Sequence, residues 1–319
     1  MSISQRVQSD RAEHKPIVDV RDLIIEFDTP HGRKRVVDQV SFKVRSGEVL
    51  GILGESGSGK TMSTLAILGL VNGYPGVMGG EISLHDAAGE HSLLDGLDDA
   101  LYHSKRSGLR EKRSRAWQRR RDRKMRPLWG NSVTAIFQNP RRSLDPLMTV
   151  GAQVIESIKA RQRAHSEVAR AQAQRDEALT WLNRVRMVNP QRVFDSYPHE
   201  LSGGMCQRAM IAVALACKPR LLIADEPTTG LDATVRAQVV KLLQELIEEE
   251  RCAMIYITHD IREMLYLAER VIVMRHGVVL ESVTRDDLLT KADERHEYTQ
   301  VLLSAAGVGD PHKQPNDES

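Results

Sequence analysis

The sequence VLGILGESGSGKT, residues 49–61, decides the fold of this chain. Its apolar start, Val49 to Leu53, predicts a short strand, and Gly54 to Thr61 then follow the pattern G-x-x-x-x-G-K-[ST]. Glycines at this spacing let consecutive backbone N–H groups turn inward around phosphate oxygens. The apolar residues 62–70 predict a helix whose positive N-terminus points at the same anion. We therefore expect a nucleotide-binding loop between a buried strand and a helix.

Two side chains of this loop add specific chemistry. Lys60 offers a cation to the outer phosphates of a nucleotide, and Thr61 offers a hydroxyl to Mg²⁺. Phe27, at the end of a predicted strand, could stack on an adenine face, although ordinary core packing explains it equally well. The predicted nucleotide-binding residues are Phe27, Gly54, Glu55, Ser56, Gly57, Ser58, Gly59, Lys60 and Thr61.

The composition is that of a globular protein without disulfide or metal support. With 319 residues, 41% of them apolar, the chain can bury a sizeable core. Three cysteines, Cys206, Cys217 and Cys252, without metal-ligand spacing favour buried thiols in a reducing compartment. No run of about 18 apolar residues occurs, and residues 1–15 form a polar tail without the apolar segment of a signal peptide. We expect a cytosolic chain that meets a membrane only through partners.

The net charge of +2 conceals a strongly basic segment at residues 104–126. This segment holds twelve Lys and Arg residues and two acids, a charge of +10, so the rest of the chain carries 2 − 10 = −8. A solvated helix or a disordered insert is the expected structure. Contact with anionic lipid or nucleic acid is the sharper alternative, but the single tryptophan in the run is little support for base stacking.

Strands and helices alternate along the chain, which predicts an α/β core with the glycine-rich loop at the strand ends. Four glycines after the loop helix predict a bend: Gly73, Gly76, Gly79 and Gly80. Strands are predicted at residues 17–27, 36–44, 81–84, 131–137, 220–226, 253–260, 270–274 and 278–282. Helices are predicted at residues 146–163, 166–188, with Ser166 as N-cap, and 233–250.

Two adjacent carboxylates end the apolar run RLLIADE, residues 220–226. Such a run predicts a strand buried on both faces, as in a parallel sheet covered by helices. At the end of such a strand, Asp225 could hold Mg²⁺ while Glu226 polarises a water molecule. A solvated strand end is the alternative, but the upstream phosphate loop favours a catalytic pair.

Six motifs occur together in a recognisable order. They are Gly54–Thr61, Gln138, LSGGM at 201–205, LLIADE at 221–226, Leu231-Asp232 and His259. In this arrangement the chain resembles the ATP-binding cassette (ABC) family of transport ATPases across residues 17–285. The resemblance implies an α/β fold of the P-loop NTPase (RecA-like) type, with an antiparallel β subdomain and an α-helical signature subdomain. The implied organisation is a tail at 1–15, an ABC domain at 16–285 with a helical subdomain at about 139–220 and the basic insert at 104–126, and a short C-terminal segment at 286–319.

The resemblance also implies roles for single residues. Lys60 and the loop amides would bind the β- and γ-phosphates of ATP. The implied Mg²⁺ ligands are Thr61, Gln138 and Asp225. The implied catalytic residues are Glu226 as general base, His259 as the switch histidine on the γ-phosphate, and Gln138. Ser202, Gly203 and Gly204 would contact ATP held by a second cassette, and Asp232 would communicate across that interface.

A finer resemblance concerns three segments: residues 196–232, the upstream FQNPRRSLDPLMTVGAQVIE, and the downstream HEYTQVLL. They are similar to the oligopeptide, dipeptide and nickel importer group of cassettes, in which Met often stands where Met205 does. This implies an ATP-hydrolysing subunit that energises uptake of peptides or a related small solute. Its implied cofactors are ATP and Mg²⁺. Its implied partners are a second cassette, two transmembrane permeases and a solute-binding protein at the inner membrane, whose cytoplasmic face it would occupy.

Two other functions are open to a chain of this kind. A non-transport ABC ATPase could act with a soluble enzyme complex, such as a carbon–phosphorus lyase, or with nucleic acid. Only the basic segment 104–126 favours nucleic acid, and no direct nucleic-acid contact is expected. A regulator that binds ATP without hydrolysing it is disfavoured because both Glu226 and His259 are present.

Overall fold

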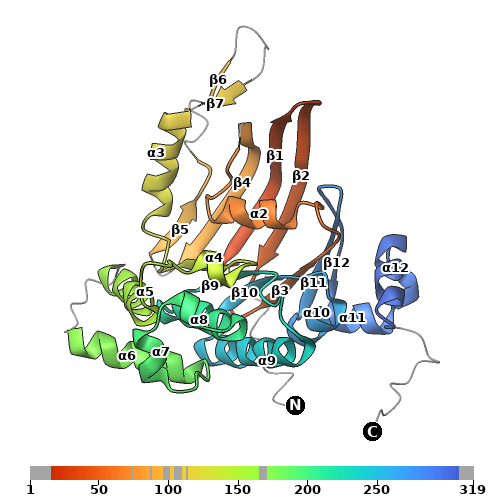
Figure 1. Ribbon diagram of the computed structural model, residues 1–319. Helices are drawn as coiled ribbons and strands as arrows, with labels where there is room; N and C mark the ends of the chain where they lie inside the picture. The colour runs from red at the N-terminus through yellow and green to blue at the C-terminus, as the bar shows by residue number, and fades with distance from the viewer. Residues whose placement is uncertain are drawn as a thin grey trace.

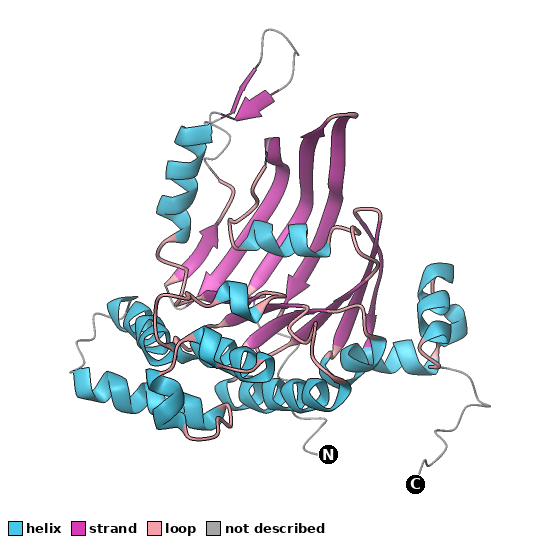
Figure 2. Cartoon of the chain, in the orientation of Figure 1, coloured by secondary structure: helices cyan, strands magenta, loops and turns pink. Residues whose placement is uncertain are grey.

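The computed structural model describes residues 16–73, 75–86, 88–95, 101–103, 110–112, 114–164 and 171–308. The predicted tail at 1–15, the N-cap at Ser166 and the end of the chain after residue 308 lie outside these ranges. The described chain forms two main sheets with helices gathered on the outer side of one of them (Figures 1 and 2).

The larger sheet is the α/β core. Its six strands run in the order β12-β11-β3-β10-β9-β8. Five of them pair in parallel, and β12 adds an antiparallel edge. Their bounds are β3 (Val49–Leu53), β8 (Val133–Ile136), β9 (Leu221–Asp225), β10 (Ala253–Ile257), β11 (Arg270–Arg275) and β12 (Val278–Thr284). Every residue of β3, β9 and β10 is buried, as the apolar runs predicted.

The second sheet is antiparallel and has the order β2-β1-β4-β5. Its strands are β1 (Val18–Thr29), β2 (Gly32–Val44), β4 (Pro75–Asp86) and β5 (Gly89–Ser92). The predicted bend after the loop helix is wrong in part, because Gly76, Gly79 and Gly80 lie within β4. Gly80 has φ +100°, and a Cβ there would lie 2.7 Å from the Arg21 carbonyl oxygen, at a point where the β1–β4 register shifts. The glycines therefore permit an irregular strand rather than a turn.

Helix α2 (Lys60–Ile67) lies between the two sheets. Alternate residues of β3 face opposite sides, since Leu50 and Ile52 join α2 and the antiparallel sheet in one apolar core. Val49 and Leu53 join a second core under the remaining helices. These helices are α4 (Pro140–Ser143), α5 (Val150–Ala164), α6 (Ala171–Arg184), α7 (Pro190–Asp195), η3 (Pro198–Glu200), α8 (Gly203–Ala216), α9 (Ala233–Glu250) and α10 (Ile261–Leu267).

The predicted helix boundaries are confirmed for α9 but are wrong at an end of α5 and of α6. Helix α9 spans residues 233–250, as its spacing predicted. Helix α5 begins at Val150 rather than residue 146, because Asp145 to Met148 form a turn whose backbone is bonded by the Gln153 side chain. Helix α6 ends at Arg184, and the backbone turns at Arg186, which has φ 58°. Among the described helices none is long and apolar enough to cross a membrane.

Part of the basic segment is helical, and a helix is one of the two structures expected from its sequence. Helix α3 (Ser114–Met125) stands beside β5, next to a short hairpin of β6 (Leu101–His103) and β7 (Arg110–Lys112) (Figure 1). The helix is anchored at its C-terminal end, where Met125 is 1% exposed and Lys124 donates to the Ser92 carbonyl oxygen at 2.9 Å.

The C-terminal part of the described chain is helical as well. It consists of α11 (Arg285–Thr290), the 3-10 turn η4 (Ala292–Glu294) and α12 (Glu297–Ala305). Leu288, Tyr298 and Leu303 are buried and belong to the apolar core of the helical side. Helix α12 is therefore packed against the core of the larger sheet.

Candidate active site

The predicted phosphate loop lies between the end of β3 and the start of α2. Gly59 immediately precedes the helix with φ +101°, and a Cβ there would lie 2.8 Å from the Val36 carbonyl oxygen. Gly54 has φ +154°, and its Cβ would lie 2.2 Å from the Met274 carbonyl oxygen. Both positions therefore require glycine for backbone conformation and for space.

Lys60 folds back onto this loop. Its ammonium donates to the carbonyl oxygens of Gly54 at 2.7 Å and Glu55 at 2.8 Å. The residue is only 6% exposed, and burial lowers the pKa of its amine. A cation held by neutral carbonyls in a buried site is poorly compensated, so an incoming anion would be favoured there.

Asp225 ends β9, and its pKa is shifted in the opposite direction from that of Lys60. It is 9% exposed, and burial raises the pKa of its carboxyl group, although a hydrogen bond from the Thr61 side chain opposes this shift. A buried carboxylate of this kind would be stabilised by a cation. Lys60 and Asp225 together therefore form a site whose charges would be balanced by phosphate and a metal ion.

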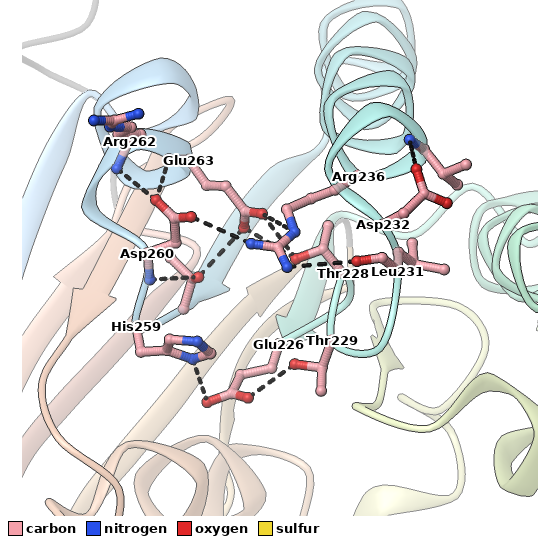
Figure 3. Close-up of polar contacts among 12 residues, drawn as sticks. Glu226, Thr228, Thr229, Leu231, Asp232, Arg236, His259, Asp260, Arg262 and Glu263 are labelled. Carbon is pink, nitrogen blue, oxygen red and sulfur yellow. Dashed lines mark hydrogen bonds and ion pairs between the residues drawn. The ribbon is translucent and has the colours of Figure 1, made fainter. Parts of the chain in front are cut away.

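The three predicted catalytic side chains meet at Glu226. Gln138, just after β8, donates its amide N–H to one carboxylate oxygen of Glu226 at 3.0 Å, and Thr229 donates its hydroxyl to the same oxygen at 3.0 Å. His259 Nδ1 lies 3.3 Å from the other oxygen. Figure 3 shows Glu226 between Thr229 and His259. Thr229 is a contact that sequence reasoning missed.

Glu226 also has an unusual backbone. Its φ is +46°, in the left-handed region, and its N–H donates to the Ile257 carbonyl oxygen at 2.9 Å. A non-glycine residue held in this region costs on the order of 1–3 kcal/mol and persists only where the surroundings fix it. Such strain is typical of functional sites, and here it turns the carboxylate out of the strand toward Gln138 and His259.

Residues 226–232, beginning with Glu226, form a loop that we call the carboxylate loop. A buried glutamate holds this loop in place. Glu263 of α10 accepts from the Thr228 hydroxyl at 2.9 Å and from the Tyr256 hydroxyl at 2.6 Å. Burial raises the pKa of Tyr256, which keeps its phenol protonated as a donor. Arg236 of α9 pairs with Glu263 at 3.7 Å (Figure 3). No motif pointed to Glu263, although its place four residues after His259 puts it one helical turn from the site.

Arg236 ties the same loop to α10. Its guanidinium lies 3.4 Å from the Asp260 carboxylate and donates to the Leu231 carbonyl oxygen at 3.5 Å (Figure 3). Asp232 ends the loop as the N-cap of α9, accepting from the Val235 N–H at 3.0 Å. A role for Asp232 across a dimer interface stays a prediction, because its visible contact is local.

The signature residues lie apart from the phosphate loop. Ser202 caps α8, its hydroxyl accepting from the Met205 N–H at 3.3 Å. Gly203 lines a groove of about 520 Å³ together with Gln138 and Arg141 and with residues 229–231 of the carboxylate loop. Within the part of the chain that the structure describes, no hydrogen bond or ion pair joins Ser202, Gly203 or Gly204 to residues 54–61. Gly203 therefore lies beside Gln138 and the carboxylate loop within one chain.

Phe27 is partly buried against the apolar core of the antiparallel sheet. Its ring covers Gly73, where an added Cβ would meet the Phe27 ring at 2.6 Å. Core packing accounts for these contacts, and stacking on a base stays a prediction.

A metal in this site would depend on few protein ligands. Among the described residues, no group of three or more His, Cys, Asp or Glu side chains could hold a metal ion. Asp225 and Thr61 supply one carboxylate and one hydroxyl. That donor set suits Mg²⁺, which is commonly held by one or two carboxylates together with substrate phosphates.

Comparison with known proteins identifies the family. The family model described as ABC transporter matches residues 37–229, from β2 to the carboxylate loop. The chain belongs to the ABC transporter family.

Among its relatives, the dipeptide transport ATP-binding protein DppD of Escherichia coli (strain K12) is 41% identical over 289 residues, 91% of this chain and 78% of that protein. The glutathione import ATP-binding protein GsiA of Pectobacterium atrosepticum is 40% identical over 302 residues, 94% of this chain and 44% of that protein.

A solved structure shares the fold. The cassette MJ0796, in a dimeric post-hydrolysis state bound to ADP and phosphate, matches with a TM-score of 0.62 and 22% identity, covering 84% of this chain and 98% of that one. The predicted α/β cassette fold is thus confirmed.

Proposed function

We propose that this ABC transporter family member is the ATP-hydrolysing subunit of an importer for peptides or a related small solute. The observation that carries the ATPase activity is the convergence of Gln138, Thr229 and His259 on the Glu226 carboxylate, beside a buried Lys60. The transported class rests on the relatives, which are named for dipeptide transport and glutathione import.

The proposed hydrolysis needs positioning and charge balance more than covalent chemistry. Lys60 would leave the carbonyl oxygens of Gly54 and Glu55 and meet the outer phosphates, together with the amides of residues 56–61. Glu226 would orient a water molecule and receive its proton at the carboxylate oxygen that Gln138 and Thr229 leave open, with those two donors holding the other oxygen. His259, whose side chain is 65% exposed, is free to turn toward the γ-phosphate while staying near Glu226.

Mg²⁺ fits the residues on the protein side. Thr61, Asp225 and the amide oxygen of Gln138 would hold it, and burial, which raises the pKa of Asp225, makes a cation favourable beside its carboxylate. When bound, Mg²⁺ would neutralise negative charge on the phosphate oxygens. Thr61 would keep Asp225 oriented through the hydrogen bond that already joins them.

The proposed assembly follows from which surfaces stay open. Ser202, Gly203 and Gly204, at the start of α8, would meet nucleotide held by a second cassette, and Asp232 would lie at the same interface. Two members of this signature, Ser202 and Gly203, are exposed, so a second cassette could reach them. A dimer of cassettes would therefore complete each site.

Two permeases would dock on the surface at Phe137, the residue before Gln138. A mostly apolar groove of about 320 Å³ lies there, and its lining includes Leu68, Trp129, Phe137 and Val213. Phe137 directly precedes Gln138, so a permease segment bound in this groove would touch the residue next to Gln138 in the chain. We propose residues 16–285 as the ABC domain, residues 139–220 as its helical subdomain and residues 286–319 as a C-terminal segment. A solute-binding protein and a place at the cytoplasmic face of the inner membrane complete the proposal.

The test uses Glu226→Gln in the full chain. Wild type is expected to hydrolyse ATP in Mg²⁺ and to stop when the metal is chelated. The variant should keep ATP binding, lose on the order of 10²–10⁴-fold in turnover, as loss of a general base does, and stay dimeric with ATP. Normal turnover in the variant would contradict the assignment of Glu226.

The same variant identifies the partners. Purified from solubilised membranes with ATP, it should bring two permeases and a second cassette. Soluble enzymes or nucleic acid in their place would move the function to a non-transport ATPase.

A further inference from the structure

The segment HEYTQVLL, residues 296–303, forms the start of α12 and reaches the phosphate loop. The Tyr298 hydroxyl accepts a hydrogen bond from the Glu55 N–H at 3.1 Å, across 243 positions of sequence. In Figure 1 α12 lies at the edge of the molecule beyond α11 and β12. This single side chain therefore connects a peripheral helix to the centre of the nucleotide site.

Tyr298 is held firmly in this position. The residue is 6% exposed, and the Arg275 guanidinium lies over its ring, 4.6 Å from the centroid. The next residue, Thr299, is fully buried and donates its hydroxyl to Glu281 of β12 at 2.6 Å. Burial raises the pKa of Tyr298, so its hydroxyl is protonated at physiological pH. The helix is thus fixed to the edge of the parallel sheet independently of the loop.

The peptide that Tyr298 contacts is central to the loop. The Glu55 carbonyl oxygen accepts from the Lys60 ammonium at 2.8 Å and from the Ser58 N–H at 3.2 Å. The Glu55 N–H and its neighbouring carbonyl group are thus both bonded, one to α12 and the other to the lysine. A rotation about this residue would move the carbonyl that positions Lys60.

We propose that Tyr298 is a positioning residue of the phosphate loop, and that it couples docking of α12 to nucleotide binding. By accepting from the Glu55 N–H, the phenol keeps the loop in its phosphate-binding conformation before nucleotide arrives. This lowers the conformational entropy that the loop loses on binding. This inference rests on the proposed role of residues 54–61 as a phosphate site. The coupling is reciprocal, so bound nucleotide should in turn secure α12.

The test compares Tyr298→Phe with Thr299→Val in the full chain. Tyr298→Phe removes only the hydroxyl and keeps the ring under Arg275. Because a net hydrogen bond contributes about 0.5–1.5 kcal/mol, the Kd for ADP and the KM for ATP should rise about two- to twelvefold, with kcat nearly unchanged. Thr299→Val removes the neighbouring bond to Glu281, which does not touch the loop. It should lower the melting temperature and, acting only through the docking of α12, raise the Kd for ADP by less than Tyr298→Phe does.

A second measurement needs no variant. Hydrogen exchange of wild type should show added protection in residues 297–305 when ADP is bound, and Tyr298→Phe should lose that added protection. Equal Kd for ADP in wild type and Tyr298→Phe, or equal shifts in both variants, would overturn the proposal. No protection of α12 by ADP in wild type would overturn it as well.

The proposed function fails by a different outcome. If wild type binds neither ADP nor ATP, residues 54–61 are not a nucleotide site. If wild type binds ADP and only the Tyr298 comparison is flat, the site stands and the coupling to α12 does not.

Discussion

The phosphate loop and the carboxylate loop lie at neighbouring strand ends, yet they are held in different ways. The phosphate loop is held mainly by local sequence, since its glycines supply the backbone conformation and Lys60 bonds carbonyl groups five and six residues away, with Tyr298 and Gly277 as distant contacts. The carboxylate loop depends on residues far along the chain. Thr228 is bonded to Glu263, 35 positions away, and Glu226 to Gln138, 88 positions away, so elements distant in the sequence fix its path.

The two loops, which form the two halves of the proposed site, are held differently because their proposed roles differ. A phosphate-binding loop presents backbone N–H groups, and any chain with the right glycines can form one. A general base has to be aimed to within a fraction of an ångström, since a misplacement of about 1 Å can cost on the order of 10²-fold in rate. The strained backbone of Glu226, with φ +46°, shows that its aim is imposed by the surrounding structure.

The variant Glu263→Gln tests most directly whether distant contacts hold the carboxylate loop. The amide retains shape but loses the charge that Tyr256, Thr228 and Arg236 share, and charge-assisted hydrogen bonds contribute about 1.5–3 kcal/mol each. We expect a loss of about 2–4 kcal/mol in unfolding free energy and a fall of about 10–100-fold in kcat, because the carboxylate loop loosens. Unfolding in denaturant and steady-state ATPase rates measure the two effects.

The matched control is Glu48→Gln. Glu48 is a buried carboxylate of the same kind, bonded to the Arg270 guanidinium at 2.8 Å and the Arg45 N–H at 2.7 Å, at the opposite end of β3 from the phosphate loop. It should lower stability without lowering kcat of the folded protein. If both variants lose kcat equally, the contrast between a local and a long-range half of the site is wrong.

The same contrast explains how much the sequence could predict. The motifs placed Lys60, Asp225 and Glu226 at strand ends, because a glycine pattern and two apolar runs are local signals. Gln138 and His259 came from the family resemblance, and the structure brings both to Glu226. Glu263, Thr229 and Tyr298 could not be found in this way, since a lone Glu, Thr or Tyr has no distinguishing pattern until folding brings its partner near.

The antiparallel sheet was predicted, but the irregular course of β4 was not. Gly76, Gly79 and Gly80 usually indicate a turn, but here they lie in β4, and at Gly80 the backbone passes close to Arg21 and Asp22 of β1. Only the partner strand explains why glycine is needed there. Sequence signals of this kind report a backbone requirement without reporting its cause.

A smaller effect, of opposite sign for stability and for function, is expected from Asp225→Asn. Burial raises the pKa of Asp225 in the folded state above its unfolded value of 3.8. The folded protein therefore binds the proton more tightly, and stability is lost as pH rises above 3.8 and the group ionises. The amide cannot ionise, so the variant should melt at a higher temperature than wild type at pH 7, and this gain should vanish near pH 3.8 and below.

Function should move the other way in this variant. Replacing a charged ligand by a neutral amide should weaken Mg²⁺-dependent ATP binding by about tenfold, which corresponds to ~1.4 kcal/mol. Thermal melts across pH without nucleotide, and ATP titrations with and without Mg²⁺, test the two halves separately. A lower melting temperature at pH 7 would show that the hydrogen bond from Thr61 outweighs burial.

The smallest effect is expected from α3, which lies outside both halves of the site. Arg119 and Arg123 are exposed, and surface substitutions usually change stability by less than about 0.5 kcal/mol. The double variant Arg119→Gln, Arg123→Gln should therefore keep ATP affinity and melting temperature. Met125→Ala is the contrasting change, because Met125 is 1% exposed against the end of α2, and emptying such a position costs about 2–5 kcal/mol. If the arginine variant lost ATP affinity instead, α3 would have to be counted as a third support of the site, and the division into a local and a long-range half would no longer describe it.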